Sequence, residues 1–342
     1  MNHLPKPFIV LALVALLAAA CSPTSGPLGT PATPPPTDLP SVEAPTDDAT
    51  PDLSSPSPTT APTATPSAPA SPSPSPSEAP TEQPTSSAAP TKAPTGTTIV
   101  RAYFFLGSFT DNAGLAPVLR EIPRTQAVAT AAMKALLAGP NDAELGARPA
   151  MYTDIPDGTR LLGLTIKDGT ATVDLSAEFE PGGGRASILG RLAQVVYTLT
   201  QFPTVDQVLF KLDGEPVTVF GGAGVKLDHP VGRDDYTNQL PAIFMDRPAW
   251  GAALGHPGRV AGVANVFEAT FRVRLLDANG AVLVDRQVMA SCGTGCWGTY
   301  RVDLAYTVSK GQYGALRVYD RSAKDGTPEN ITEYPVWLTP GG

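Results

Sequence analysis

A long proline-rich tract limits the part of this chain that can fold. Residues 22–96 hold 21 of the 38 prolines, and Ser, Thr and Ala fill most of the other positions. The tract has no aromatic residue, so it buries too little apolar surface to offset the entropy cost of ordering. In extended polyproline II, at about 3.1 Å per residue, it would reach at most on the order of 230 Å. We therefore predict a disordered linker over residues 21–97.

The segment before the tract predicts export and membrane attachment. Residues 8–20 are apolar, Lys6 precedes them, and residues 17–21 read LAAAC. This pattern is typical of a secretory signal peptide, and its end resembles the lipobox of bacterial lipoproteins. The apolar run is shorter than the roughly 20 residues that span a bilayer. We predict a signal peptide over residues 1–20 and an extracytoplasmic protein anchored by lipid on Cys21; a secreted protein with an unmodified Cys21 is the alternative.

The charge of the chain argues against a nucleic-acid partner. The net charge is −8, and the linker, with seven Asp and Glu against Lys92 alone, accounts for −6 of it. Lys6 adds +1, so residues 97–342 carry −3, whereas nucleic acid requires a basic face. Their length suits two domains of ordinary size.

Two cysteines lie in the C-terminal part. Cys292 and Cys296 stand in SCGTGCW, and in an exported protein such a pair predicts a disulfide. Extended, four residue steps span about 13 Å, so bonded Cα atoms roughly 4.4–6.8 Å apart require a tight turn, which two glycines permit. A metal or redox pair is the alternative, but few other Cys or His residues could complete it. We expect no metal and no cofactor.

Residues 98–238 alternate strand and helix signals. Strands are predicted at residues 98–106, 161–167, 170–175, 208–212 and 217–220, with Asp-Gly turns at 168–169 and 213–214. Apolar spacing predicts a helix that is N-capped by Thr125 and ends at Gly139-Pro140. A second helix is predicted from residue 186 or 187, with the stripe Ile188, Leu189, Leu192, Val195, Val196 and Leu199. These signals predict an α+β domain with a mixed sheet and two helices.

Four motifs in this region resemble one known family. They are residues 138–140 (AGP), 155–159 (IPDGT), 171–176 (ATVDLS) and 194–200 (QVVYTLT). In this order they look like a GerMN domain, a module named after sporulation and spore germination. The resemblance implies an α/β module related to ring-building domains of envelope complexes, with a role in assembly or binding. It supplies no catalytic residues.

Residues 239–342 have an all-β pattern. Phe267, Ala269, Phe271, Val273 and Leu275 alternate with polar residues, which is typical of a strand with one buried face. Further strands are predicted at residues 242–245, 259–264, 281–290, 298–304, 314–319 and 333–338. About seven short strands predict a β-sandwich.

This second region also resembles a known family. The similar motifs are residues 265–271 (NVFEATF), 276–277 (LD), 298–300 (GTY), 319–320 (YD), 322–326 (SAKDG) and 329–330 (EN). They look like the immunoglobulin-like domain of bacterial spore germination. The resemblance implies an immunoglobulin-like sandwich in which a Cys292–Cys296 bridge closes a loop at one end.

The sequence offers few residues for catalysis. It has no Gly-x-Ser-x-Gly elbow, P-loop or His-Glu-x-x-His motif. His229 and His256 each precede a proline in predicted loops, where surface positions are expected. Carboxylates that could in principle serve acid–base glycoside chemistry are Asp234, Asp235, Glu178 and Glu180. Gly183, Gly184 and Arg185 precede a predicted helix and could bind an anion, although a family entry loop is the simpler interpretation.

Three functions agree with these features. The first is a non-enzymatic, membrane-anchored envelope lipoprotein that binds or assembles with envelope proteins or with peptidoglycan or another wall glycan. It predicts exposed apolar or aromatic patches around Trp250 or Trp297. The second is an envelope hydrolase with an unrecognised carboxylate site. The third, a solute-binding lipoprotein, would require two lobes around a cleft, which these two small domains match poorly. We adopt the first as our hypothesis.

Overall fold

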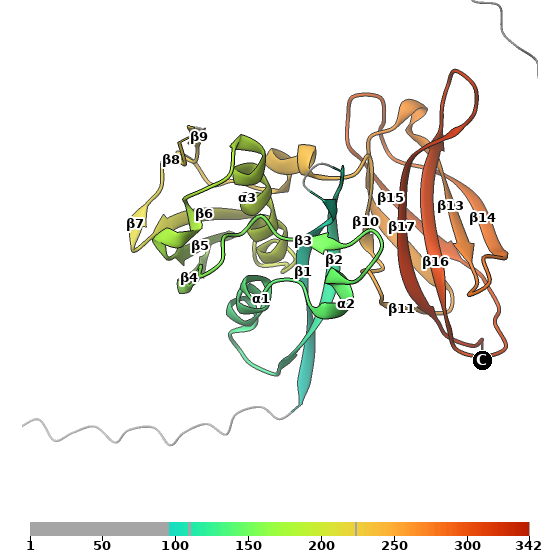
Figure 1. Cartoon of the computed structure of the whole chain (residues 1–342), viewed down its shortest axis with the longest axis horizontal. Helices are drawn as coiled ribbons and strands as arrows, with labels where there is room; N and C mark the ends of the chain where they lie inside the picture. Colours follow the sequence, from blue (N-terminus) through green and yellow to red (C-terminus); the bar gives the residue numbers. More distant parts are fainter. Residues whose placement is uncertain (1–95, 109–110, 223, 342) are drawn as a thin grey trace, which may run out of the picture. The chain divides into compact units, whose positions relative to one another are not determined.

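The computed structural model describes residues 96–108, 111–222 and 224–341 (Figure 1). The predicted signal peptide, the predicted lipid anchor Cys21 and almost all of the predicted linker lie outside these residues. In the described ranges, no helix is both long enough and apolar enough to cross a membrane.

An antiparallel sheet opens the first domain. Strand β1 (Thr97–Ser108) lies between β2 (Asp111–Pro123) and β3 (Met151–Tyr152). The β-branched and aromatic run of the sequence supplies β1, and its aromatic side chains Tyr103, Phe104 and Phe105 are fully buried. The sequence pattern does not predict β2, because Gly114 and Pro117 interrupt it. Pro117 lies opposite Tyr103, and its carbonyl points away from β1 and accepts the Trp250 N–H at 2.8 Å. The side of Pro117 that lacks an N–H therefore also faces away from β1, and the hairpin loses no hydrogen bond.

Both predicted helices are present. Helix α1 (Val128–Leu137) ends before Gly139, which has φ of 78°. The prediction of Thr125 as its N-cap is wrong: Ala127 holds that position, and the Thr125 hydroxyl accepts the Ala127 N–H at 3.1 Å, ahead of the helix. The hydroxyl therefore closes a local turn instead of capping. A short helix α2 (Asp142–Leu145), with a capping box between Asn141 and Glu144, was not indicated by the apolar pattern.

A second sheet has the strand order β4-β5-β6-β7. Strands β4 (Leu161–Lys167) and β5 (Thr170–Leu175) have the predicted bounds, and positive φ angles at Asp168 and Gly169 form their turn. Strand β6 (Gln207–Leu212) runs parallel to β5. The predicted pairing of residues 208–212 with 217–220 is wrong. After the turn, β7 (Glu215–Pro216) pairs with β6, whereas β8 (Val219–Phe220) pairs with β9 (Val225–Lys226). Beyond Pro216 a single bond continues towards β6, from the Val217 N–H to the Phe210 carbonyl at 3.1 Å, before the chain turns to β9.

Helix α3 (Arg185–Leu199) makes the crossover between β5 and β6. It contacts β1 of one sheet and β6 of the other, so almost every side chain from Ser187 to Leu199 is buried. The predicted apolar stripe is buried as expected, with Leu189 only half-buried. Burial on its other sides also encloses polar residues, among them Arg191 and Gln194.

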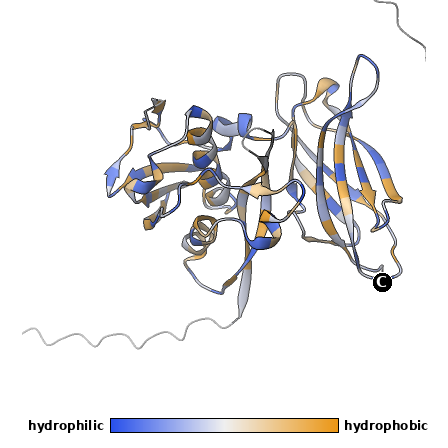
Figure 2. Cartoon of the chain, viewed as in Figure 1, coloured by the Kyte–Doolittle hydropathy of each residue, from blue (hydrophilic) through white to orange (hydrophobic). Residues whose placement is uncertain are grey.

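The second domain consists of two sheets. One has the order β10-β12-β15, formed by β10 (Ile243–Arg247), β12 (Gly258–Ala264) and β15 (Gly298–Leu304). The other has the order β11-β17-β16-β13-β14, formed by β11 (Ala253–Leu254), β17 (Pro328–Leu338), β16 (Gln312–Arg321), β13 (Thr270–Leu276) and β14 (Val282–Met289). Apolar and polar residues alternate along these strands (Figure 2). The predicted class, an α+β domain followed by an all-β domain, is confirmed.

One predicted strand begins later than expected. Residues Phe267–Ala269 form the 3-10 turn η3 instead, and Glu268 and Ala269 have positive φ angles of 53° and 56°. The turn leaves the Phe267 side chain 54% exposed, although the alternation predicted its burial. From Thr270 onward the alternation and the strand agree.

The buried side chains of the two domains form one continuous cluster. At their junction the rings of Tyr197 and Phe244 meet edge to face, with centroids 5.8 Å apart. Trp250 is half-buried against the same cluster, and its segment bridges to Val118 of β2.

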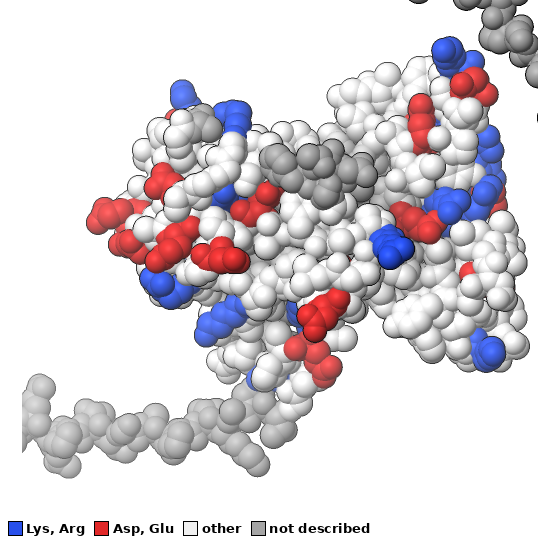
Figure 3. Space-filling model, in the orientation of Figure 1, with Lys and Arg blue, Asp and Glu red and all other residues white. Residues whose placement is uncertain are grey.

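The charges differ between the domains. Residues 98–238 carry sixteen Asp and Glu against twelve Lys and Arg, a net charge of −4. Residues 239–342 carry nine Asp and Glu against ten Lys and Arg, a net charge of +1. In Figure 3 acidic side chains gather over the β5–β7 end of the first domain.

Candidate functional site

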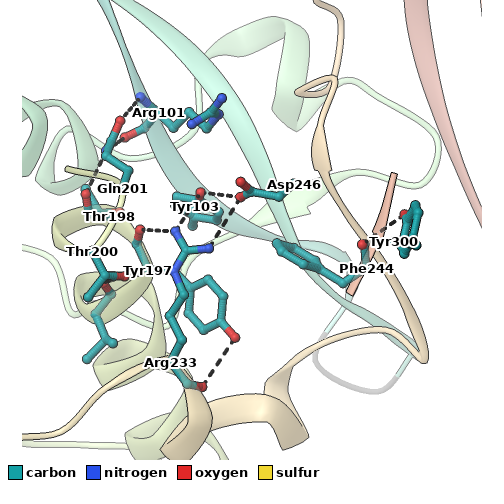
Figure 4. A network of polar contacts seen from close by, with 11 residues as sticks. Arg101, Tyr103, Tyr197, Thr198, Thr200, Gln201, Arg233, Phe244, Asp246 and Tyr300 are labelled. Carbon is teal, nitrogen blue, oxygen red and sulfur yellow. Dashed lines mark hydrogen bonds and ion pairs between the residues drawn. The ribbon is translucent and has the colours of Figure 1, made fainter. Parts of the chain in front are cut away.

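A partly buried polar cluster connects the two domains at Arg233 (Figure 4). Arg233 opens the 3-10 helix η2 (Arg233–Gln239), which follows β9 and packs on α3. Its Nε donates to the Thr200 hydroxyl at 2.8 Å, and its Nη2 donates to the Tyr197 carbonyl at 3.3 Å. Its Nη1 lies 3.6 Å from Oδ1 of Asp246 on β10. The guanidinium thereby joins the end of α3 to the first strand of the second domain.

Tyr103 completes this cluster. Its hydroxyl donates to Asp246 Oδ1 at 2.6 Å and lies 3.3 Å from Nη2 of Arg233. Burial, together with the Asp246 charge, raises the pKa of Tyr103 well above 10, so the phenol stays protonated. Burial opposes the charge on Arg233, but Tyr103 and Asp246 outweigh it and raise the pKa of Arg233. The cluster thus holds one cation, one anion and one neutral donor.

Beside this cluster lies a groove of about 470 Å³, which we call the junction groove. Its floor includes the buried rings of Tyr197, Phe244 and Tyr300, together with Ala261, Gly262, Val263 and the half-buried Trp297. Gly262 is required there, since a Cβ would overlap the carbonyl oxygen of Phe244. Asp234, Arg247 and Arg301 stand exposed at its rim. An apolar floor with a charged rim is suited to binding a ligand or a partner side chain.

The polar groups of this cluster are engaged with one another. The Asp246 carboxylate faces Tyr103 and Arg233, and the Tyr300 hydroxyl donates to the Phe244 carbonyl at 3.1 Å. The contacts therefore assign these groups a part in holding the junction together. Within the described ranges, no group of three His, Cys, Asp or Glu residues could hold a metal ion.

The predicted anion-binding residues lie at the start of α3. Gly184 is its N-cap, Gly183 has φ of 72°, and Arg185 is exposed. Gly183 and Gly184 line a recess of about 470 Å³ together with Gly182, Gly221 and Gly222, whereas Arg185 is not part of its lining. An anion-binding role for this loop stays a prediction.

The loop is ordered by Arg191, which the sequence analysis did not single out. Its guanidinium donates to the carbonyls of Phe179, Glu180, Pro181 and Gly182, at 2.8, 3.2, 3.0 and 2.8 Å, and to the Ser187 hydroxyl at 3.2 Å. Arg191 is only 2% exposed. The available signal was a charged residue within an otherwise apolar helical stripe, between Ile188 and Leu192.

Asp154 is the one described carboxyl whose pKa is strongly raised. Burial raises it to about 6, against the opposing effects of the Ser187 hydroxyl and the Arg191 charge. Next to it, the backbone N–H of Asp154 donates to Gln194 at 2.9 Å, and Gln194 in turn donates to the Tyr103 carbonyl at 2.9 Å. Asp154 therefore belongs to the packing around α3.

The other predicted candidates do not converge. His229 is exposed and contacts its neighbour Asp228 at 2.8 Å, whereas His256 is exposed, lies 2.5 Å from the Thr339 carbonyl and stacks on Tyr306. The four predicted carboxylates do not face one another. Glu178 pairs with Arg160, Glu180 accepts the Gly221 N–H, and Asp235 accepts the Gly232 N–H. Asp234 stands at the rim of the junction groove.

The two cysteines are joined in the structure. Cys292 and Cys296 form a disulfide across Cα atoms 5.9 Å apart. Gly293 packs so closely on Ala269 that a Cβ would overlap the Ala269 backbone. Positive φ angles at Thr294 and Gly295 produce the tight turn.

Comparison with known proteins agrees with both resemblances. The family model for sporulation and spore germination matches residues 101–218, and the model for the immunoglobulin-like domain of bacterial spore germination matches residues 242–327. No curated protein matches the chain.

Solved structures of GerMN domains are similar to part of the chain. The tandem GerMN domains of the sporulation protein GerM from Bacillus subtilis are 25% identical to this chain, with a TM-score of 0.33. The match covers 44% of this chain and 49%, about half, of that structure. The first GerMN domain of the same protein is 19% identical over 40% of this chain and 99% of its own length, with a TM-score of 0.34. By its two family matches, this chain carries a GerMN domain of the sporulation and spore germination family, followed by an immunoglobulin-like domain of bacterial spore germination.

Proposed function

We propose that this chain is a non-enzymatic lipoprotein of the cell envelope, whose two domains bind or assemble with envelope proteins or with cell-wall glycan. The lipobox resemblance at Cys21 and the proline-rich tract support an extracytoplasmic location. Both domains belong to germination families. The structural observation that carries the proposal is the junction groove, which lies where these two domains meet.

The side chains of the groove favour a partner. Trp297 is half-buried on its floor, and Trp and Arg are enriched among the residues that dominate binding energies at interfaces. Arg247 and Arg301 are exposed, and their guanidinium groups have neither an ion pair nor a hydrogen bond to any described residue. They are thus available to acidic groups of a partner. Trp250 is half-buried like Trp297, but it does not line the groove.

Crosslinking in intact cells tests the proposal. We expect full-length protein to capture an envelope partner or wall fragments, and we expect Arg301→Glu and Trp297→Ala in the groove to reduce the capture at least about fivefold. Arg124→Glu, an exposed arginine after β2 that does not line the groove, is the matched control and should leave the capture unchanged. Equal capture by all variants would exclude the groove. Failure to capture any partner, together with turnover of purified cell wall by the full-length protein, would favour the hydrolase alternative.

Membrane anchoring is tested separately. Cys21→Ser removes the thiol that a lipoprotein would acylate, so the protein should move from the membrane fraction into the medium. Ser22→Ala, at the adjacent position, should leave the distribution unchanged. If the Cys21→Ser protein stays in the membrane fraction, lipid on Cys21 is not the anchor.

A further inference from the structure

A second recess lies close to the junction groove but has a different character. It has a volume of about 440 Å³ and is lined by Arg101, Arg247, Arg259 and His256, with Leu119 and Pro248 among its apolar walls. We call it the arginine recess. Its lining contains no Asp or Glu among the described residues.

The charges of the recess are only partly compensated. Arg259 pairs with Asp303 on the neighbouring strand, with 3.0 Å between Nε and Oδ1. Arg101 and Arg247 form no ion pair, and their guanidinium groups have no hydrogen-bond partner, among the described residues. Asp246, the acid that precedes Arg247 in the sequence, is engaged by Tyr103 and Arg233.

Arg101 is the most informative of the three. Its Nε is inaccessible to solvent and unpartnered, whereas its backbone is held by Gln201 on both its N–H and its carbonyl, each at 2.7 Å. A half-buried guanidinium without a counter-charge is costly, so such a group requires an explanation. A bound anion that accepts from the outer guanidinium nitrogens would provide that counter-charge.

We propose that the arginine recess binds an organic phosphate. Arginines from β1, β10 and β12 line one recess, and a tetrahedral phosphate can accept hydrogen bonds from several guanidinium groups at once. A planar carboxylate, in contrast, matches a single arginine fork. The walls formed by Leu119 and Pro248 would lie against the carbon chain of an ester. His256 is fixed at the edge by its stacking on Tyr306 and its contact with the Thr339 carbonyl.

This inference deepens the proposed binding function, on which it rests, by naming a ligand class. An experiment can nevertheless contradict the phosphate site without contradicting the binding function of the junction groove, and the reverse. Arg101 and Arg259 line only the arginine recess, whereas Arg301 and Trp297 line only the junction groove; Arg247 lines both.

Calorimetric titration of the full-length protein in detergent tests it. The probes are glycerol 3-phosphate, the diester glycerophosphoglycerol, inorganic phosphate and, as a carboxylate, acetate. We expect both esters to bind more tightly than acetate, with affinities that fall as salt is added. Preference for the monoester would indicate a small soluble phosphate, and preference for the diester would indicate a lipid headgroup or a wall polymer.

Variants locate the site. Arg101→Gln and Arg247→Gln should each weaken the binding of the preferred ester about tenfold or more, which corresponds to the loss of one charge-assisted hydrogen bond. Arg124→Gln, an exposed arginine after β2 that lines neither the recess nor the groove, should change it less than twofold. Arg247 is exposed, so its replacement keeps the test valid if Arg101→Gln fails to fold. No binding of either ester, equal affinity for acetate, or unchanged affinity in both recess variants would overturn the proposal.

Discussion

The Tyr103 hydroxyl donates a 2.6 Å hydrogen bond to Oδ1 of Asp246, and this bond joins β1 of the first domain to β10 of the second. The two residues are 143 positions apart in the sequence. Tyr103 is fully buried, and its raised pKa keeps it a donor at all physiological pH values. The junction therefore includes a specific polar contact in addition to the continuous apolar core.

Removal of this hydroxyl should weaken the junction. Tyr103→Phe takes away one buried hydrogen bond to a charged acceptor, so we expect the free energy of unfolding to fall by about 1–2 kcal/mol. Urea denaturation of the full-length protein measures the loss. Tyr313→Phe is the control, because that ring is 59% exposed and its hydroxyl has no partner among the described residues. An equal change in both variants would show that the Asp246 contact contributes nothing specific.

The sequence indicates local elements of this protein better than it indicates its site. Strands β4 and β5 and the helix α3 follow from alternation, Asp-Gly turn chemistry and apolar spacing, all of which act within a few residues. The contact of Tyr103 with Asp246 depends on how the two domains pack, and that of Arg233 with Tyr103 joins residues 130 positions apart within the first domain. No local pattern carries that information.

The failures have physical causes as well. Strand β2 contains Gly114 and Pro117, which weaken a strand signal, yet it is stabilised by its long pairing with β1. Phe267 continues an apolar alternation, but the positive φ angles of Glu268 and Ala269 turn the chain before the strand starts. Arg191 is buried because α3 lies between two sheets. The apolar stripe of the sequence predicts contact with one sheet only, so it does not indicate the second sheet.

Arg191 should be among the most sensitive positions of the first domain. Arg191→Leu keeps much of the volume but removes the donors that satisfy four backbone carbonyls of residues 179–182. We expect the free energy of unfolding to fall by about 3 kcal/mol, with faster amide exchange in residues 180–187. Arg185→Leu, six positions earlier and exposed, should change stability by less than about 0.5 kcal/mol. Similar losses at both positions would contradict the structural role of Arg191.

Asp154 should make stability depend on pH. Its pKa of about 6 in the folded protein lies above the value near 3.8 expected on unfolding, because burial disfavours the carboxylate. Between these two pH values the folded state binds more protons than the unfolded state. The stability that the protonated Asp154 contributes is therefore complete below about pH 4 and is lost as the pH rises through 6. Relative to the wild type, Asp154→Asn should therefore gain about 1–2 kcal/mol between pH 4 and 7, with solvent screening taken into account.

Urea denaturation across this pH range measures the difference between the two proteins, which removes the contributions of groups that they share. Ser187→Ala provides an internal check, since the Ser187 hydroxyl lowers the pKa of Asp154. Its loss should move the midpoint of the pH dependence upward. A constant difference between the wild type and Asp154→Asn from pH 4 to 7 would show that Asp154 does not titrate in this range.

The disulfide between Cys292 and Cys296 should stabilise the second domain modestly. A bridge that closes so short a loop contributes about 2 kcal/mol in the chain-entropy model. The turn is also held by three hydrogen bonds at 2.9 Å, from the Thr294 N–H to the Val266 carbonyl, from the Glu268 N–H to the Thr294 hydroxyl and from the Gly295 N–H to Asn265. The double variant Cys292→Ala/Cys296→Ala should therefore fold and lose about 2 kcal/mol or less in urea denaturation. Reductant should lower the free energy of unfolding of the wild type by the same amount and leave that of the double variant unchanged. An equal effect of reductant on both proteins would show that it does not act through this disulfide.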